Sequence, residues 1–205
     1  MARNLKQKCL QFLRDERGSV IVEFIFVIPL YVWIVVGTMQ FFHAFRAEMV
    51  ATKVSLAMAD LVSRQNGNIT SSFISGSHEF MKYLTVGDLN PQFRLTIVRQ
   101  HKDYNAGGAA QYVVWSKATG TVTPLTDESI STIQGNIPIL FDSERVIFLE
   151  TWSTYVPLFN LTAWLWMDAG LGSSVNLSRQ IAVHPRFAKQ ICWQDDGQPD
   201  RNKLC

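Results

Sequence analysis

Charge is missing from one long stretch of the sequence. Residues 24–45 contain no Asp, Glu, Lys or Arg, and a helix needs about 20 apolar residues to cross a bilayer core. The stretch is therefore long enough to span a membrane once. It is too long for the apolar region of a secretory signal, which has about 7–15 residues. Its end, at Phe42, His43, Phe45 and Arg46, offers no pair of small residues for signal cleavage.

Catalytic and metal-binding motifs are missing as well. The four histidines, at positions 43, 78, 101 and 184, have no partners at metal-ligand spacing. The run 78–82 begins like a zinc-protease helix, but Lys82 stands where the second histidine must be. The acidic tail 195–200 lacks the ligand spacing of an EF-hand. We therefore expect no enzyme, no cofactor and no metal site, and an anchored hydrolase is the weakest interpretation.

Positive charge gathers ahead of the apolar stretch. Five basic residues stand there against two acidic ones, Asp15 and Glu16: Arg3, Lys6, Lys8, Arg14 and Arg17. The positive-inside rule keeps such an end in the cytoplasm. The part after the span is then exported, into the periplasm in a cell with two membranes. A net charge of +2 over the whole chain predicts no nucleic-acid partner.

Cysteine is scarce, with three in the chain. Cys9 precedes the span, whereas Cys192 and Cys205 lie in the exported part, where thiols can be oxidised. A disulfide between these two would close a short loop and contribute about 3 kcal/mol. It would pin an otherwise loose C-terminal tail. Two unpaired thiols on that tail are the alternative.

One carboxylate, Glu23, stands at the edge of the apolar stretch, a few residues after Gly18. A charge at the centre of a membrane helix costs roughly 2.5–3.5 kcal/mol on insertion scales and less near the interface. A carboxylate there indicates a function that involves a partner, and a plain anchor gives no reason for it. The alternative is an interfacial glutamate that reaches headgroup water.

Gly18, four further residues, then Glu23-Phe24 and a long apolar helix resemble the signal of type IV-like prepilins. The run Val-Glu-Phe-Ile-Phe-Val-Ile-Pro-Leu at 22–30 further resembles the TadE/TadF pseudopilins, or minor pilins, of the tight-adherence (Flp) pilus system. The resemblance covers mainly residues 14–62. The major Flp pilins carry Glu-Tyr where this chain has Glu-Phe, which favours the pseudopilin branch.

The resemblance implies a processing site and partners. A membrane prepilin peptidase would cut after Gly18 on the cytoplasmic side and leave Ser19 as the new N-terminus. Glu23, next to Phe24, could then pair with the amine of a neighbouring subunit and set its register. The implied partners are the peptidase, other pilins or pseudopilins and the inner-membrane assembly platform. The implied location is the inner membrane, as a single-pass protein with a periplasmic C-terminal domain, or the pilus or cell surface.

The helix is expected to continue beyond the span. Residues 46–63 lack Gly and Pro and repeat apolar side chains at an i, i+4, i+7 spacing, at Val50, Val54, Ala57 and Leu61. This pattern predicts an amphipathic continuation over 46–65 that lies against the exported domain. We expect the Asn-Gly-Asn segment 66–68 to end it with a left-handed cap.

The exported part, 66–205, is expected to contain a helix and several strands. The helix is predicted at 71–84, and residues 127–134 are predicted to form one or two helical turns. Alternating or β-branched segments predict strands at 94–100, 111–116, 145–155 and 176–183. The second should pair antiparallel with the first through a turn at 105–108. The expected fold class is α+β, with a long N-terminal transmembrane helix that extends into a periplasmic domain with a small antiparallel sheet.

The expected organisation is a basic cytoplasmic leader at 1–18, a transmembrane helix at 19–45, its continuation at 46–65 and the exported domain at 66–205. The apolar segment 156–167 is too short and interrupted for a second span. It either packs in the core or at the sheet edge, or forms an exposed patch that meets another subunit or the membrane.

Two functional hypotheses follow. In the first, the chain is a membrane-anchored pseudopilin that is cleaved after Gly18 and takes part in assembling Flp/Tad type IV pili for adherence. In the second, it is an uncleaved, single-pass periplasmic binding or sensor domain in which Glu23 is incidental. Whether the mature protein begins at Ser19 separates them.

Overall fold

The computed structural model is described for five stretches of the chain: residues 19–85, 90–103, 108–158, 174–195 and 204–205. The chain divides into two units, Met1–His43 and Ala44–Cys205. The helix α2 (Ser19–Ser63) contributes residues to both of them. The expected leader 1–18, with Gly18, lies outside the described residues.

The second unit is built on a four-stranded antiparallel sheet. Its strands are β1 (Gln92–Asp103), β2 (Gly108–Ala118), β3 (Arg145–Tyr155) and β4 (Val175–Val183), in the order β2-β1-β3-β4. The α+β class, the four predicted strands and the antiparallel pairing of the first two are confirmed. The expected turn between β1 and β2 falls on residues 104–107, which lie outside the described part.

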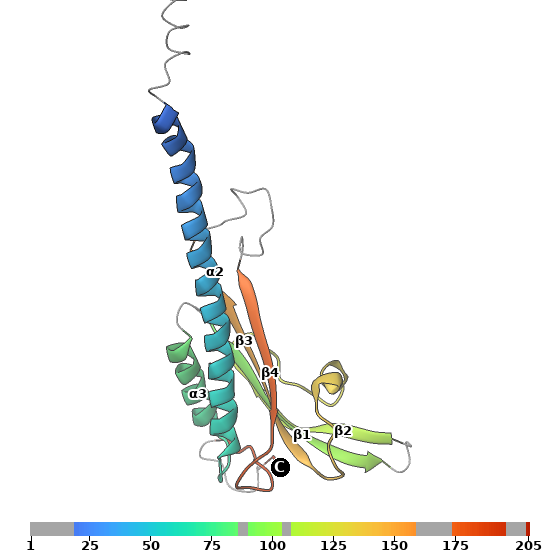
Figure 1. Ribbon diagram of the computed structural model, residues 1–205. Helices are drawn as coiled ribbons and strands as arrows, with labels where there is room; N and C mark the ends of the chain where they lie inside the picture. The colour runs from blue at the N-terminus through green and yellow to red at the C-terminus, as the bar shows by residue number, and fades with distance from the viewer. Residues whose placement is uncertain (1–18, 86–89, 104–107, 159–173, 196–203) are drawn as a thin grey trace, which may run out of the picture. The chain divides into compact units, whose positions relative to one another are not determined.

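Two helical segments cover one face of this sheet. The helix α3 (Ser71–Leu84) has the predicted bounds, and the Thr70 side chain caps it by accepting a hydrogen bond from the Phe73 amide. Figure 1 shows α3 beside the C-terminal half of α2, with the strands extending to the right of α2. Buried side chains from α2, α3, β1 and β3 form one apolar core, which includes Met58, Met81, Leu95 and Leu149.

A second apolar core fills the opposite face of the sheet. The segment between β2 and β3 carries two short 3-10 turns, η2 (Ile130–Thr132) and η3 (Gln134–Asn136), in the region of the predicted helical turns. Its Ile130 and Ile133 pack with Val146 and Phe148 of β3. Both faces of β3 are thus covered, which is why its centre is an unbroken apolar run instead of an alternating one.

The structure corrects two expectations about α2. The buried positions in its C-terminal half are Ala51, Val54, Ser55, Met58, Ala59, Val62 and Ser63, whereas Ala57 is exposed. The prediction was therefore wrong at Ala57, because at about 100° per residue this position lies on the opposite side of Val54 from the buried stripe. The cap was also wrong, since the helix ends at Ser63 and Gly67 does not adopt a positive φ.

Side chains and a backbone contact close this end of α2 in place of a left-handed residue. The Ser63 hydroxyl donates to the Asp60 carbonyl at 2.8 Å, and the Gln65 side-chain amide donates to the Leu61 carbonyl at 3.1 Å. The Arg186 amide donates to the Ser63 carbonyl at 2.9 Å. The free carbonyls of a helix end are satisfied in this way without a glycine.

Candidate functional site

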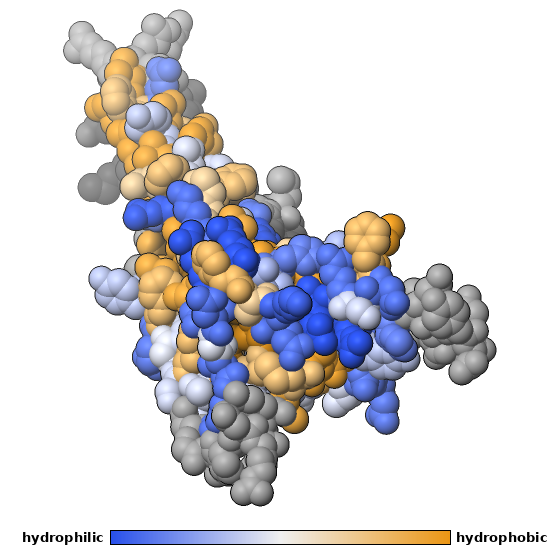
Figure 2. Space-filling model, turned by 90° about the horizontal axis from the view of Figure 1, so that it is seen from below, coloured by the Kyte–Doolittle hydropathy of each residue, from blue (hydrophilic) through white to orange (hydrophobic). Residues whose placement is uncertain are grey.

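The first unit presents an apolar helix surface that is largely exposed. In the part of α2 that runs from Val20 to Phe42, most large apolar side chains are exposed, for example Ile21, Phe26 and Tyr31, whereas Gly37 and Gln40 are buried. Only 6% of its most apolar window is buried, and the helix is long and apolar enough to cross a membrane. Figure 2 shows this part of α2 mostly in the hydrophobic colour. A helix that is apolar all round requires an apolar environment.

Glu23 stands inside this apolar surface, one turn from the start of the helix at Ser19. Its neighbours Val22 and Phe24 are exposed, at 53% and 58%, and Glu23 is exposed as well. Within the described part of the chain, its carboxylate has no hydrogen bond and no ion pair. Residues four apart on a helix lie on the same face, so Ser19 and Glu23 are neighbours. The Glu23 carboxylate is therefore exposed on the apolar surface of α2.

An open apolar hollow lies next to this carboxylate. Its volume is about 430 Å³, and its lining comes from α2 alone: Val20, Ile21, Phe24, Ile25, Ile28 and Pro29. The helix runs through Pro29 without a break. Phe24, which the sequence singled out with Glu23, belongs to this lining. A hollow of this kind on a helix can receive a side chain of a second helix, as in ridge-and-groove packing.

Cys192 and Cys205 are joined by a disulfide, with 4.7 Å between their Cα atoms. Backbone hydrogen bonds hold the chain next to both cysteines. The Ile69 amide donates to the Cys192 carbonyl at 2.8 Å, and Trp193 and Leu204 exchange two bonds of 2.9 Å. The Trp115 indole N–H donates to the Ile191 carbonyl at 2.9 Å. The C-terminal segment is thus attached to β2 and to the segment before α3.

Residues that resembled catalytic motifs serve structural roles. His78 Nε2 lies 2.8 Å from the Pro91 carbonyl, and Lys82 pairs with Glu79 at 2.9 Å. The Lys82 ammonium lowers the pKa of Glu79 through a hydrogen bond and its charge. Among the residues that the structure describes, no group of three or more His, Cys, Asp or Glu could hold a metal ion. Asp195 accepts a bond of 3.0 Å from the Trp193 indole, and the rest of the acidic tail, 196–200, lies outside those residues.

The apolar segment 156–167 is described only at its start. Val156 and Leu158 are 60% and 74% exposed, and residues 159–167 lie outside the described part. Both interpretations of this segment therefore stay open.

The sequence analysis missed a buried ion pair between neighbouring strands. Arg94 Nη2 lies 2.5 Å from Glu150 Oε2, with the two side chains 14% and 2% exposed. The signal was present in the sequence, because Glu150 is the single acidic residue of the predicted strand 145–155 and follows directly on its apolar run 146–149. Such a residue is buried only when it has a partner.

Comparison with known proteins points to the same helix. Residues 18–60 match a family model described as TadE-like protein. The resemblance inferred from the sequence is thereby confirmed for this segment, which contains the apolar helix, Glu23 and the residue before Ser19. No curated protein and no solved structure matches the chain.

Proposed function

We propose that the chain, which is TadE-like over residues 18–60, is a pilin-like assembly subunit of a Tad pilus system that a prepilin peptidase processes after Gly18. The observation that carries the proposal is the exposed apolar helix with a carboxylate near its start, Glu23, that has no partner among the residues that the structure describes. In this function the chain is the substrate of a peptidase and not an enzyme. Its N-terminus faces the cytoplasm, and the sheet-bearing unit is exported.

Cleavage after Gly18 would create a cationic partner for Glu23. The new ammonium group would stand on Ser19, on the same helix face as the carboxylate of Glu23. Removing each ion from water costs several kcal/mol, so both remain in the membrane only when they are paired. The amine of an incoming subunit can satisfy Glu23 and so fix how far one helix slides along another.

Membrane anchoring and subunit assembly then use the same surface. The apolar side chains around α2 can face lipid before assembly and other helices after it. The hollow beside Phe24 and Pro29 offers a place for a side chain of the partner helix. The partners in this proposal are the prepilin peptidase, other pilins and the assembly platform of the inner membrane.

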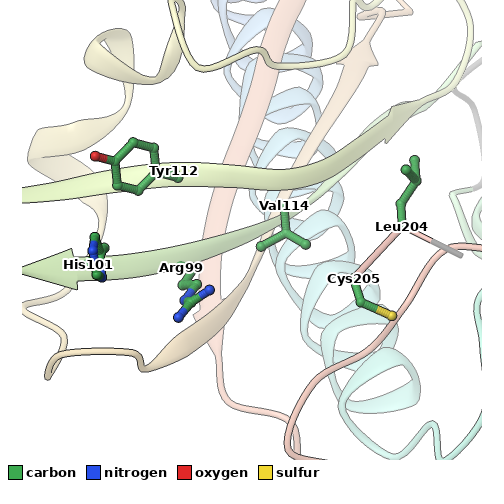
Figure 3. Close-up of a pocket in the computed structure, with 6 residues that line it drawn as sticks. All are labelled: Arg99, His101, Tyr112, Val114, Leu204 and Cys205. Carbon is green, nitrogen blue, oxygen red and sulfur yellow. The ribbon is translucent and has the colours of Figure 1, made fainter.

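The test is the N-terminal residue of the full-length product, purified from its own membranes and read by intact mass. A start at Ser19 supports the proposal. A start at Met1 or Ala2 overturns it and favours an uncleaved, anchored binding or sensor domain. An open cavity in the second unit, lined in part by Arg99 (Figure 3), favours that second function because it could hold a ligand.

A further inference from the structure

The exposed apolar surface of α2 continues into the second unit. Phe45, Met49 and Leu56 all belong to that unit, and their side chains are 62%, 56% and 54% exposed. At about 100° per residue, the three lie within about 40° of one another around the helix. Met58, nine positions after Met49, lies on the opposite side and is buried in the core. We call Phe45, Met49 and Leu56 the outer stripe of α2.

Two cations flank the outer stripe. Arg46 and Lys53 are both exposed, and their spacing of seven positions puts them on one side of the stripe. Within the described part of the chain, neither of them has an ion pair. The acids of this part of α2, Glu48 and Asp60, already pair with arginines of the same unit at 2.7 and 3.0 Å. The outer stripe therefore presents apolar surface beside positive charge that its own acids do not balance.

Lipid can cover only the beginning of the outer stripe if the charge-free part of α2 crosses the membrane. Leu56 comes eleven positions after Phe45, where the charge-free stretch ends, and this length of helix measures about 16 Å. The headgroup layer on one side of a bilayer is about 5–8 Å thick. A helix tilt of about 40° would still leave Leu56 about 12 Å beyond the hydrocarbon. Only another protein can bury the far end of the stripe.

A second copy of this chain does not suit the outer stripe. Chains that enter the membrane from the same side pack their helices in parallel, and in register Arg46 would then face Arg46 and Lys53 would face Lys53. A stagger of two turns would bring Arg46 against Lys53. Like charges across an interface cost up to several kcal/mol. Charge complementarity therefore favours a different chain that carries acids at these places.

We propose that the outer stripe binds a helix of a different membrane-anchored subunit, which has an apolar stripe of its own and two carboxylates seven residues apart. Seven residues of helix measure about 10.5 Å, so carboxylates at this spacing can pair with both Arg46 and Lys53. Apolar side chains of the partner at three- and four-residue spacing pack between Phe45, Met49 and Leu56, as they do between the helices of a coiled coil. This inference rests on the proposed function, which supplies the membrane crossing and the other subunits. It adds that the contact extends beyond the bilayer and that the partner is acidic there.

The test is photo-cross-linking in cells that produce the pilus system, with p-benzoylphenylalanine at position 56 of the full chain. Mass spectrometry identifies the cross-linked peptide. We expect a helical segment of a second membrane-anchored protein, with Asp or Glu at a seven-residue spacing. The cross-linker at position 83 is the control, because Tyr83 lies on α3 and is 82% exposed, and it should not give this product. Cross-links to lipid, to a second copy of this chain or to a segment without these acids overturn the inference, as does the absence of any product.

Reversing the two charges tests the role of the cations. Arg46→Glu combined with Lys53→Glu should lower the yield of the cross-link about tenfold, because two attractive contacts become repulsive. The combination of Arg46→Lys with Lys53→Arg keeps both charges and should retain the yield. Lys189→Glu, at an exposed lysine outside α2, is the matched control. Both positions on α2 are exposed, so the melting temperature of the second unit should not change. An undiminished cross-link in the double glutamate variant overturns the inference.

The intact mass of the chain that is not cross-linked, read in the same sample, separates this inference from the proposed processing. A start at Ser19 without the cross-link overturns the inference alone. A start at Met1 or Ala2 with the cross-link overturns the processing and supports the acidic partner.

Discussion

Arg94 and Glu150 are register partners on β1 and β3, and their side chains form an ion pair that is almost completely removed from solvent. The Gln180 side-chain amide donates to the second Glu150 oxygen at 3.2 Å, and Arg94 Nη1 donates to the Thr123 carbonyl at 3.0 Å. The Arg94 guanidinium also lies 5.4 Å from the centre of the Trp152 ring. Each charged group is therefore satisfied by several neighbours, which is the condition under which a buried pair is tolerated.

Breaking this pair should destabilise the second unit strongly. Glu150→Gln keeps the shape of the side chain but leaves Arg94 buried and charged, and we expect a loss of about 3 kcal/mol or more. Chemical denaturation of the full chain in detergent, followed by tryptophan fluorescence, measures it. Glu79→Gln is the control, since that acid forms an exposed pair with Lys82, and its loss should stay below about 1 kcal/mol. Equal losses in the two variants would contradict the prediction.

Gly18→Val should abolish processing of the chain, because a branched side chain is not expected to fit a peptidase pocket that takes glycine. The measurement is the intact mass of the product from native membranes. Gly67→Val is the matched control, since a Cβ at Gly67 meets no atom within 4 Å. Normal cleavage of Gly18→Val would count against recognition of this signal.

Glu23→Ala should leave membrane insertion intact and impair assembly. The apolar helix still supplies the insertion energy, whereas an incoming amine loses its partner, at a cost of several kcal/mol. Copurification of cross-linked pilus subunits should fall at least about tenfold, since each 1.4 kcal/mol is a factor of ten. Glu128→Ala, at an exposed position of the second unit, is the control. Unchanged copurification would mean that Glu23 only reaches interfacial water.

Cys192→Ser or Cys205→Ser should lower the stability of the second unit by about 3 kcal/mol, because the disulfide restricts the unfolded chain. Denaturation of each variant measures the loss, and the wild type with a reducing agent should match it. Mass mapping of the C-terminal peptides without reduction gives the independent check. Free thiols at both positions in protein from native membranes would rule out the bond.

Tyr155→Phe should stabilise the chain at alkaline pH. Burial raises the pKa of the Tyr155 hydroxyl, and this oxygen has no hydrogen-bond partner within the described residues. At pH values well below the ordinary pKa of tyrosine, near 10, the hydroxyl is protonated in both the folded and the unfolded state, and the stabilising effect of the raised pKa is fully present. As the pH rises above that value, the unfolded state ionises first and stability falls. Phenylalanine removes this dependence, so melting curves at pH 7 and pH 10.5 should diverge less in the variant than in the wild type.

Local patterns in the sequence were enough to predict most of the secondary structure. The helix at 71–84 and the strand at 145–155 have the predicted bounds, since each follows from spacing within a single segment. Strand β1 is longer than predicted, because Gln92 and Phe93 pair with β3. The end of α2 was missed because its caps come from Ser63 and Gln65 and from the distant Arg186.

Pairs between strands could not be predicted, because they depend on register. The pairs Arg94–Glu150 and Arg99–Arg145 each join residues about fifty positions apart, and a shift of one residue would turn the side chains of a strand to the opposite face. An irregularity between Ile97 and Val98 shifts the pairing with β2 as well. By contrast, Glu23 was found from the sequence because a charge next to a long apolar run needs no tertiary information.

The contacts of α2 inside the second unit have a mechanical consequence. Two ion pairs hold the helix: Arg179 Nη2 of β4 lies 2.7 Å from Glu48 Oε1, and Arg186 Nη2 lies 3.0 Å from Asp60 Oδ1. Between them, the hydroxyl oxygens of Ser55 and of Thr151 in β3 lie 2.6 Å apart. These attachments are spread along several turns of one helix. A tensile load on the chain at Ala44 is therefore divided among many contacts that resist sliding together. Under the proposed function, a force on the apolar helix of an assembled subunit would reach the sheet through several contacts at once and would not unfold the second unit from one end.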